Sequence, residues 1–326
     1  MPIFYLFSGK IVYNDPMQRV IFIFIDGAGM GRADAGNPFF QAKSLFLPFW
    51  QGAMILPDNT PLTAIDATLG IPGIPQSASG QTALFCGIGA EAIANHHHNG
   101  YPDLHLRKII RGKNLLLCLK KNGVCAQFLN AYPGFHDFFS SEHIQINADG
   151  RFWFSDAFPP RFKKMISVTS CMLLASGQNP FSETAIRAGR SLYQDYSNRQ
   201  LISQGLKLPE YSPAQAAEII AAAAKNCDFI LYEYFQTDIY AHRRSYAECI
   251  DLIRDLDTLV GSLISHLDHK LDTLVLTSDH GNMEEFHSRG HSRNPVPFLA
   301  WGRHGTFLRT RIKGISDVTP AILELY

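Results

Sequence analysis

The sequence contains few cysteines, and they are widely spaced. Six occur in 326 residues, and no two of them form the C-x-x-C pair that is typical of zinc sites and disulfide-rich scaffolds. We therefore expect reduced, mostly buried thiols, as in a cytoplasmic protein. The six are Cys86, Cys118, Cys125, Cys171, Cys227 and Cys249.

The sequence also has no long apolar run and no excess of charge of one sign. Its longest apolar runs, such as 20–25, fall far short of the roughly 20 residues that cross a bilayer, and no secretory leader is recognisable. Lys plus Arg and Asp plus Glu are balanced at 29 each, so no global field attracts nucleic acid or an anionic membrane. We predict neither a nucleic-acid partner nor a membrane partner, and the oligomeric state stays open.

The chain does contain strand-length apolar runs that alternate with helical patterns. Strands are predicted within 19–29, 228–238, 272–281 and 296–302, and helices over 212–226 and 243–267. Ser212, Pro213 and Gln215 form the start signal of the first of these helices, a capping box with proline at the first helical position. This alternation predicts an α/β fold with a mainly parallel sheet flanked by helices.

The middle of the chain has shorter periodic segments and is rich in Arg, Lys, Phe and Ser. Its patterns predict a helix over 114–123, a strand over 124–133 and a helix over 182–202. We therefore predict a catalytic α/β domain made of 17–104 and 209–326, with 105–208 inserted as a smaller α+β cap. Residues 1–16 fit no clear element, and we leave open whether they are an additional arm or a start-site artefact.

Acidic and imidazole side chains follow the predicted strands. Asp26 ends the first strand, Asp238 follows the second, and Asp279 with His280 follows the third. Ligands of parallel sheets bind outside the carboxyl ends of the strands, so these side chains are expected at one edge. A lone aspartate there is more often a helix cap or a turn residue. Their convergence is what favours a metal site.

Two histidines complete the set. His242 is four residues after Asp238, on the same face if that segment is helical, and His291 returns through a loop that contains Gly281 and Gly290. The residues suffice for two sites, one of Asp238, His242 and His291 and the other of Asp26, Asp279 and His280. Mixed carboxylate and imidazole ligation suits Zn²⁺ or Mn²⁺, and two such ions can clamp both oxygens of an in-line displacement.

A nucleophile is available in the segment "GIPGIPQSASGQTALFCG". Ser77, Ser79 and Thr82 stand at the start of an apolar helical run, and a helix N-terminus attracts phosphate oxygens. A serine that binds a divalent cation can lose its proton near neutral pH without a histidine base. The alternative is that Ser77 or Ser79 only caps the helix.

The motifs "FIDGAG", "SASGQTA", "DIYAH", "SDHGN" and "GHSRNPVP" together resemble the alkaline phosphatase superfamily. The resemblance is closest to its cofactor-independent phosphoglycerate mutases and phosphopentomutases, and it covers about 20–95 and 213–326. It implies Ser77, rather than Ser79, as the metal-bound nucleophile. It gives no role to His287, which we expect to be a loop residue. The implied ligands are Asp26, Ser77, Asp279 and His280 for one metal, and Asp238, His242 and His291 for the other.

The reaction that the resemblance implies is two-metal phosphoryl transfer on a small phosphate ester, through a phosphoserine, by a phosphatase or a phosphomutase. Gln81 stands where the mutases commonly carry His, and the length of the insert is nearer to that of a phosphopentomutase cap. Candidates for binding the substrate are His97, Arg161 and Arg243. The alternatives are hydrolysis of a phosphodiester or a sulfate ester on the same site, and a metal-binding protein without turnover.

Overall fold

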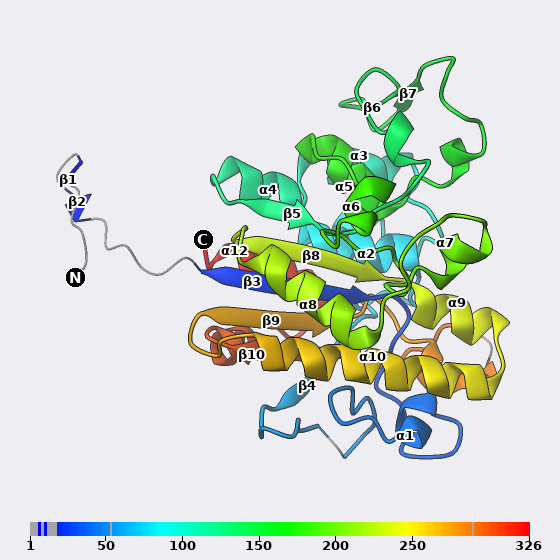
Figure 1. The fold of residues 1–326 in the computed structure, drawn as a ribbon, viewed down its shortest axis with the longest axis vertical. Coiled ribbons are helices and arrows are strands. Elements are labelled where there is room, and N and C mark those ends of the chain that lie inside the picture. Colours follow the sequence, from blue (N-terminus) through cyan, green and yellow to red (C-terminus); the bar gives the residue numbers. More distant parts are fainter. Residues whose placement is uncertain (1–5, 8–9, 12–17, 53, 289) are drawn as a thin grey trace.

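The computed structural model describes residues 6–7, 10–11, 18–52, 54–288 and 290–326. A six-stranded sheet lies at its centre (Figure 1). The strand order is β4 (Leu62–Ile65), β10 (Val296–Gly302), β9 (Asp272–Thr277), β3 (Arg19–Ile25), β8 (Phe229–Tyr234) and β5 (Ala126–Phe128). The pairs β3–β8, β3–β9 and β5–β8 are parallel, whereas β10 is antiparallel to β9 and β4. The predicted α/β fold with a mostly parallel sheet is confirmed.

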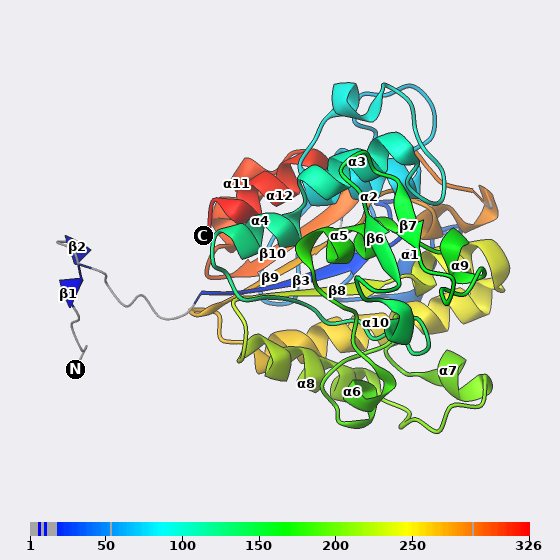
Figure 2. The ribbon, with the colours of Figure 1, turned by 90° about the horizontal axis from the view of Figure 1, so that it is seen from above.

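The sheet is covered by helices on both faces, as Figure 2 shows from above. Ile21, Ile23 and Ile25 of β3 belong to one core cluster, and Phe22 and Phe24 belong to the other. Because both faces are buried, β3 reads as a continuous apolar run without polar alternation. The first core includes residues of α1 (Pro38–Ala42), α8 (Pro213–Ala224) and α10 (Tyr246–His266); the second includes residues of α2 (Ser77–Cys86), α11 (Gly305–Arg311) and α12 (Val318–Leu323).

The two long helices begin where the sequence predicts. Ser212 caps α8 in a complete capping box with Gln215, and Pro213 occupies its first turn. Ser245 and Glu248 form a second capping box at the start of α10. The predicted segment 243–267 therefore contains two elements, because α9 (Gln236–Arg243) ends just before this cap.

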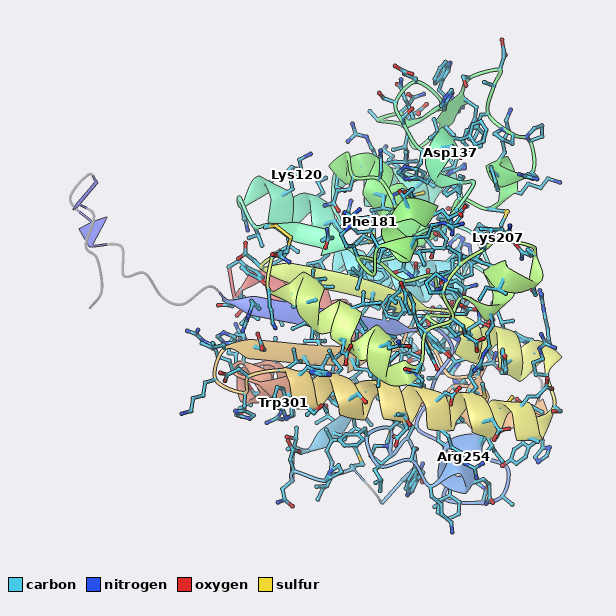
Figure 3. The ribbon with its side chains drawn as sticks, in the orientation of Figure 1. Lys120, Asp137, Phe181, Lys207, Arg254 and Trp301 are labelled. Atoms are coloured by element: carbon cyan, nitrogen blue, oxygen red, sulfur yellow. A yellow bond between two sulfur atoms is a disulfide. The ribbon has the colours of Figure 1, made fainter. Side chains whose placement is uncertain are left out.

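The segment predicted to form the cap contributes to two regions. Strand β5 lies in the central sheet and contacts α4 (Leu115–Lys121). Helix α4 packs against α5 (Val168–Ser176), and α5 packs against α3 (Leu104–Gly112). The hairpin of β6 (Ile144–Ile146) and β7 (Phe152–Phe154) projects away from the sheet, near Asp137 in Figure 3. The division into 17–104 with 209–326 and 105–208 stays a prediction, and its first residue, Met17, lies outside the described residues.

The helix predicted over 182–202 is wrong. The segment forms two short helices instead, α6 (Glu183–Arg187) and α7 (Arg199–Ser203). Gly189 and Asn198 have left-handed φ angles of +62° and +66°, which interrupt an α-helix. Between them Leu192 makes a parallel bridge to Asn130 beyond β5, so pairing with the chain replaces the local helix.

The expectation that all six cysteines are reduced is also wrong. Cys125 and Cys227 form a disulfide, visible near Lys120 in Figure 3. They precede the adjacent parallel strands β5 and β8, and this pairing brings their Cα atoms to 5.0 Å although they are 102 residues apart in sequence. The other four form no disulfide, and Cys86, Cys171 and Cys249 among them are buried, as predicted.

The remaining elements are short. They are β1 (Leu6–Phe7), β2 (Lys10–Ile11), η1 (Ala90–Ile93), η2 (His136–Phe138), η3 (Phe162–Lys164), η4 (Met283–Ser288) and η5 (Ile315–Asp317). The rest of 1–16 lies outside the described residues, so the two readings of that segment stay open. No helix within the described part of the chain has the length and apolar character of a membrane span.

Candidate metal centre

Four of the seven candidate ligands lie just past the carboxyl ends of three adjacent parallel strands. Asp26 follows β3, whereas Asp279 and His280 follow β9. Asp238 belongs to α9, which begins two residues after β8 ends. The backbone N–H of Asp26 donates to the Tyr234 carbonyl at 3.0 Å, so β3 and β8 stay paired up to the site.

Asp26, Asp279 and His280 form one buried cluster. One potential ligand atom from each lies within 4.8 Å of the other two. His280 Nε2 is 3.4 Å from Asp26 Oδ1 and 3.6 Å from Asp279 Oδ2. Ser77 Oγ is 2.9 Å from the same His280 nitrogen, so the predicted nucleophile reaches this cluster.

Asp238, His280 and His291 form a second cluster of the same kind. Asp238 Oδ1 is 3.6 Å from His291 Nε2 and 3.5 Å from His242 Nε2. The rings of His280 and His291 are stacked with their centroids 3.9 Å apart. The structure thus brings all seven predicted ligands together, with His280 between the two clusters. Which residues hold which ion stays a prediction.

The electrostatics of the clusters favour a bound cation. Burial, and then repulsion by Asp279 and Asp238, raise the pKa of Asp26 well above its ordinary value. Its buried Oδ1 has no hydrogen-bond partner among the described residues. A positive ion would relieve both penalties, because buried carboxylates need a partner of opposite charge.

Two members of the second cluster, Asp238 and His291, have pKa shifts that favour the protonation states of metal ligands. Burial raises the pKa of Asp238, but hydrogen bonds from His242 and Asn282 and the charge of His280 outweigh it and lower that pKa to about 2. Burial and repulsion by His280 lower the pKa of His291, which favours the neutral imidazole. Metal ligation requires an ionised carboxylate and a neutral imidazole, so the donor set fits a divalent cation.

The start of α2 places the nucleophile. Its N-cap is Gln76, which makes no side-chain cap bond, so neither serine caps this helix. Ser79 Oγ is engaged locally, donating to the Gln76 carbonyl at 3.0 Å and accepting from the His98 N–H at 3.2 Å. Ser77 is partly exposed, and its Oγ is within hydrogen-bond distance of His280 Nε2. This geometry favours Ser77 over Ser79.

Comparison with known proteins indicates a family resemblance. Residues 192–326, less than half of the chain, match the family model described as Metalloenzyme superfamily, and this segment contains five of the candidate ligands. Over this segment the chain is similar to that superfamily. The similarity is consistent with divalent metals at the site.

Curated relatives match only part of the chain. The 2,3-bisphosphoglycerate-independent phosphoglycerate mutase of Mycoplasma genitalium is 28% identical over 122 residues, which is 36% of this chain and 24% of that one. The enzyme of the same name from Pseudomonas fluorescens is 31% identical over 127 residues, 36% of this chain and 25% of that one. The match thus spans about a quarter of the length of these relatives.

Solved structures share the fold at low identity. The alkaline phosphatase from the Antarctic bacterium TAB5 aligns with a TM-score of 0.53 at 14% identity, covering 94% of this chain and 97% of that one. The PH0037 protein from Pyrococcus horikoshii aligns with a TM-score of 0.52 at 14% identity, covering 95% and 96%. At such identity the likeness concerns the fold alone.

Two amides near the candidate ligands were not predicted as part of the site. Gln81 Nε2 donates to Asp26 Oδ2 at 3.3 Å and to Asp279 Oδ2 at 3.1 Å. Asn282 Nδ2 donates to Asp238 Oδ1 at 2.6 Å and lies 3.1 Å from His242 Nε2. The signals were the position of Gln81 one turn after Ser77 and of Asn282 in the "DHGN" motif.

The three residues predicted to bind the substrate lie in different parts of the structure. His97 is half-buried, with Nδ1 3.4 Å from Ser79 Oγ and its ring near Gly73. Arg243 is exposed and ends α9, directly after His242. Arg161 stacks on Phe162 beyond the β6–β7 hairpin, with its guanidinium carbon 4.7 Å from the ring centroid. His287, expected in a loop, lies in η4.

Proposed function

We propose that this protein is a two-metal phosphoryl-transfer enzyme that acts on a small phosphate ester through a phosphoserine on Ser77. The observation that carries the proposal is the position of Ser77 Oγ, at the N-terminus of α2 and 2.9 Å from His280 Nε2. The reaction is that of a phosphatase if water accepts the phosphoryl group, and of a phosphomutase if a substrate hydroxyl accepts it.

In the proposed reaction Ser77 Oγ forms a bond to phosphorus while the bond from phosphorus to the ester oxygen breaks. Ser77 releases its proton to solvent, and the departing alkoxide takes up a proton and leaves as the alcohol. The N-terminal end of α2 favours the phosphate negative charge. Bound divalent cations supply Lewis-acid stabilisation of the charge that develops on the attacking and leaving oxygens. The acceptor then takes the phosphoryl group from Ser77, which regains its proton.

The proposal includes two ions, Mn²⁺ or Zn²⁺, held by Asp26, Asp279 and His280 with Ser77 and by Asp238, His242 and His291. It also includes a small phosphorylated substrate that 105–208 covers, and a cytoplasmic location. Because a mutase must exclude water, closure of this segment would favour phosphoryl return to the substrate over hydrolysis.

The first test is a Ser77→Ala variant with Ser79→Ala as its matched control. We expect Ser77→Ala to lose turnover of an aryl phosphate monoester by at least ~1000-fold, because the nucleophile is removed. Both variants should retain about two ions per chain by elemental mass spectrometry. Undiminished turnover in Ser77→Ala would rule out the phosphoserine route.

The same preparation separates the alternatives. Parallel assays with an aryl diester and an aryl sulfate would reveal a hydrolase of another ester class. Bound metal without turnover of any of the three would favour the non-catalytic metal-binding protein. An Asp238→Ala, His291→Ala double variant should retain about one ion, because only one of two sites is removed.

A further inference from the structure

A buried carboxylate that is not a candidate ligand lies beside the metal centre. Glu284, in η4, is 2% exposed, and both of its oxygens accept hydrogen bonds. Oε2 accepts from the N–H groups of Gly29 and Asn282, each at 2.8 Å. Oε1 accepts from Ser292 Oγ and from Asn294 Nδ2, the latter at 3.1 Å. Glu284 is thus a fully engaged acceptor rather than a vacant ligand.

The four donors come from three segments that carry the candidate ligands. Gly29 follows Asp26 at the end of β3. Asn282 follows His280 after β9, and Ser292 follows His291 before β10. One carboxylate therefore connects segments that are more than 250 residues apart in sequence, as the separation of 255 between Gly29 and Glu284 shows.

Three glycines leave the space that this side chain fills. A Cβ at Gly29 or Gly281 would overlap the Glu284 carboxylate, and one at Gly31 would lie 3.0 Å from its Cβ. The backbone of the ligand-bearing segments is therefore packed directly against the carboxylate. Two of these glycines lie in the segment after Asp26 and the third directly follows His280.

We propose that Glu284 is a positioning residue, which sets the relative placement of Asp26, His280 and His291 and thereby the affinity of the centre for metal. The inference rests on the proposed function, because it assumes that these residues bind cations. Partners that orient metal ligands typically change metal affinity or activity by ~10- to 100-fold when they are removed.

Two substitutions of Glu284 remove its hydrogen bonds to different extents. Glu284→Gln keeps one acceptor oxygen for the fixed backbone donors but turns an N–H₂ group toward the side chains of Ser292 and Asn294. Glu284→Met has a similar length and removes all four bonds. Glu285→Gln is the matched control, because Glu285 is exposed and also accepts from Asn294 Nδ2, at 2.9 Å.

The experiment titrates metal-free full-length protein with Co²⁺ and records its visible absorption, which reports both affinity and ligand geometry. We expect Glu285→Gln to match the wild type, Glu284→Gln to bind at least ~10-fold more weakly, and Glu284→Met to bind more weakly still. The absorption bands of the two Glu284 variants should shift as well, which a loss of global stability alone would not cause.

Hydrogen–deuterium exchange on the metal-free protein supplies a second readout. In Glu284→Gln we expect faster exchange in 27–31 and 290–295 with no change in α10.

The inference would be overturned if the Glu284→Gln variant had the same Co²⁺ affinity, absorption spectrum and exchange rates as the wild type. The proposed function would remain intact in that case. If Glu284→Met does not fold, Ser292→Ala, which removes one bond, should still weaken Co²⁺ binding, and unchanged binding in it would overturn the inference. Absence of Co²⁺ binding in the wild type would instead overturn the proposed function, and the exchange data would still test the positioning.

Discussion

At the scale of single residues, the centre is a concentration of carboxylates whose charges oppose one another. Asp26, Asp238 and Asp279 lie together, and Glu233 on β8 adds to the repulsion that Asp26 experiences. Glu233 is fully buried, and its carboxylate accepts from Thr169 Oγ1 at 2.9 Å and from the Tyr132 hydroxyl at 3.3 Å. Burial outweighs these bonds and raises the pKa of Glu233 from 4.5 to about 8.

This pKa predicts how the stability of the metal-free protein depends on pH. Between about 4.5 and about 8 the folded state holds a proton on Glu233 that the unfolded chain has lost. The free energy of unfolding should therefore fall as pH rises through this range, by up to about 1.4 kcal/mol per pH unit from this group. Urea denaturation at several pH values should show a smaller decline in Glu233→Gln. An equal decline in both proteins would contradict a raised pKa.

Site residues could be predicted from the sequence where the side chain itself can bind a metal. Carboxylates and imidazoles in and after the apolar runs identified six of the seven candidate ligands, and the family resemblance added Ser77; the structure brings all seven together. Gln81, Asn282 and Glu284 were missed, because each acts by bonding to a ligand or its loop. Such a role depends on the approach of distant segments, which a single sequence does not encode locally.

At the scale of elements, the contact between α2 and the segment after β9 places the nucleophile. A Cβ at Gly80 would lie 2.7 Å from the Asp279 carbonyl oxygen and 3.2 Å from the Asp279 Cβ. The Asp279 carbonyl oxygen belongs to the backbone, and the Asp279 Cβ is bonded directly to it. Because Asp279 is buried, neither atom can easily move away from a Cβ at Gly80. The glycine of the S-x-x-G pattern is therefore explained by packing between two elements.

Substitution of this glycine should disturb stability and metal binding together. We expect Gly80→Ala to lower the free energy of unfolding by ~1 to 3 kcal/mol through overpacking, and to weaken metal binding by displacing Asp279. Gly89→Ala is the control, because a Cβ there meets no atom within 4 Å and its φ is not in the left-handed region. Denaturant titrations of both variants make the comparison. A Gly80→Ala protein as stable as Gly89→Ala would argue against the close contact.

Elements with strong local signals were predictable, and those set by tertiary pairing were not. The apolar runs of β3, β8, β9 and β10 and the capping box of α8 suffice to identify these elements. The segment 182–202 has helical periodicity, but its turn at Gly189 and its bridge at Leu192 depend on the edge of a sheet more than 50 residues away. Pairing of this kind overrides local propensity.

At the scale of the whole molecule, the disulfide joins the start of β5 to the segment before β8. It connects residues before β5 and β8 and closes a loop with a sequence separation of 102. In the chain-entropy description a loop of this size stabilises the folded state by up to about 4.7 kcal/mol. The bond would therefore restrict how far the start of β5 can separate from β8.

Reduction should consequently lower stability without changing the fold. We expect Cys125→Ser to shift the denaturation midpoint downward in the absence of reductant and to match the wild type when dithiothreitol is present. Cys118→Ser, at a half-buried free thiol, should respond to reductant as the wild type does. Equal midpoints of the wild type with and without dithiothreitol would show that the bond does not form or does not stabilise.

The order of strands in the sheet also has a consequence for synthesis of the chain. Of the six strands of the central sheet, β3 is synthesised first, yet its neighbours β8 and β9 begin at residues 229 and 272. Within the described residues β4 pairs only with β10, which begins at 296. While the ribosome is still translating the middle of the chain, the apolar β3 has no partner strand. The apolar segment of β3 therefore stays unpaired while about 200 further residues are translated, at ~5 to 20 residues per second. An unpaired apolar strand is prone to aggregate, so the nascent chain is a candidate client for chaperones that bind emerging chains.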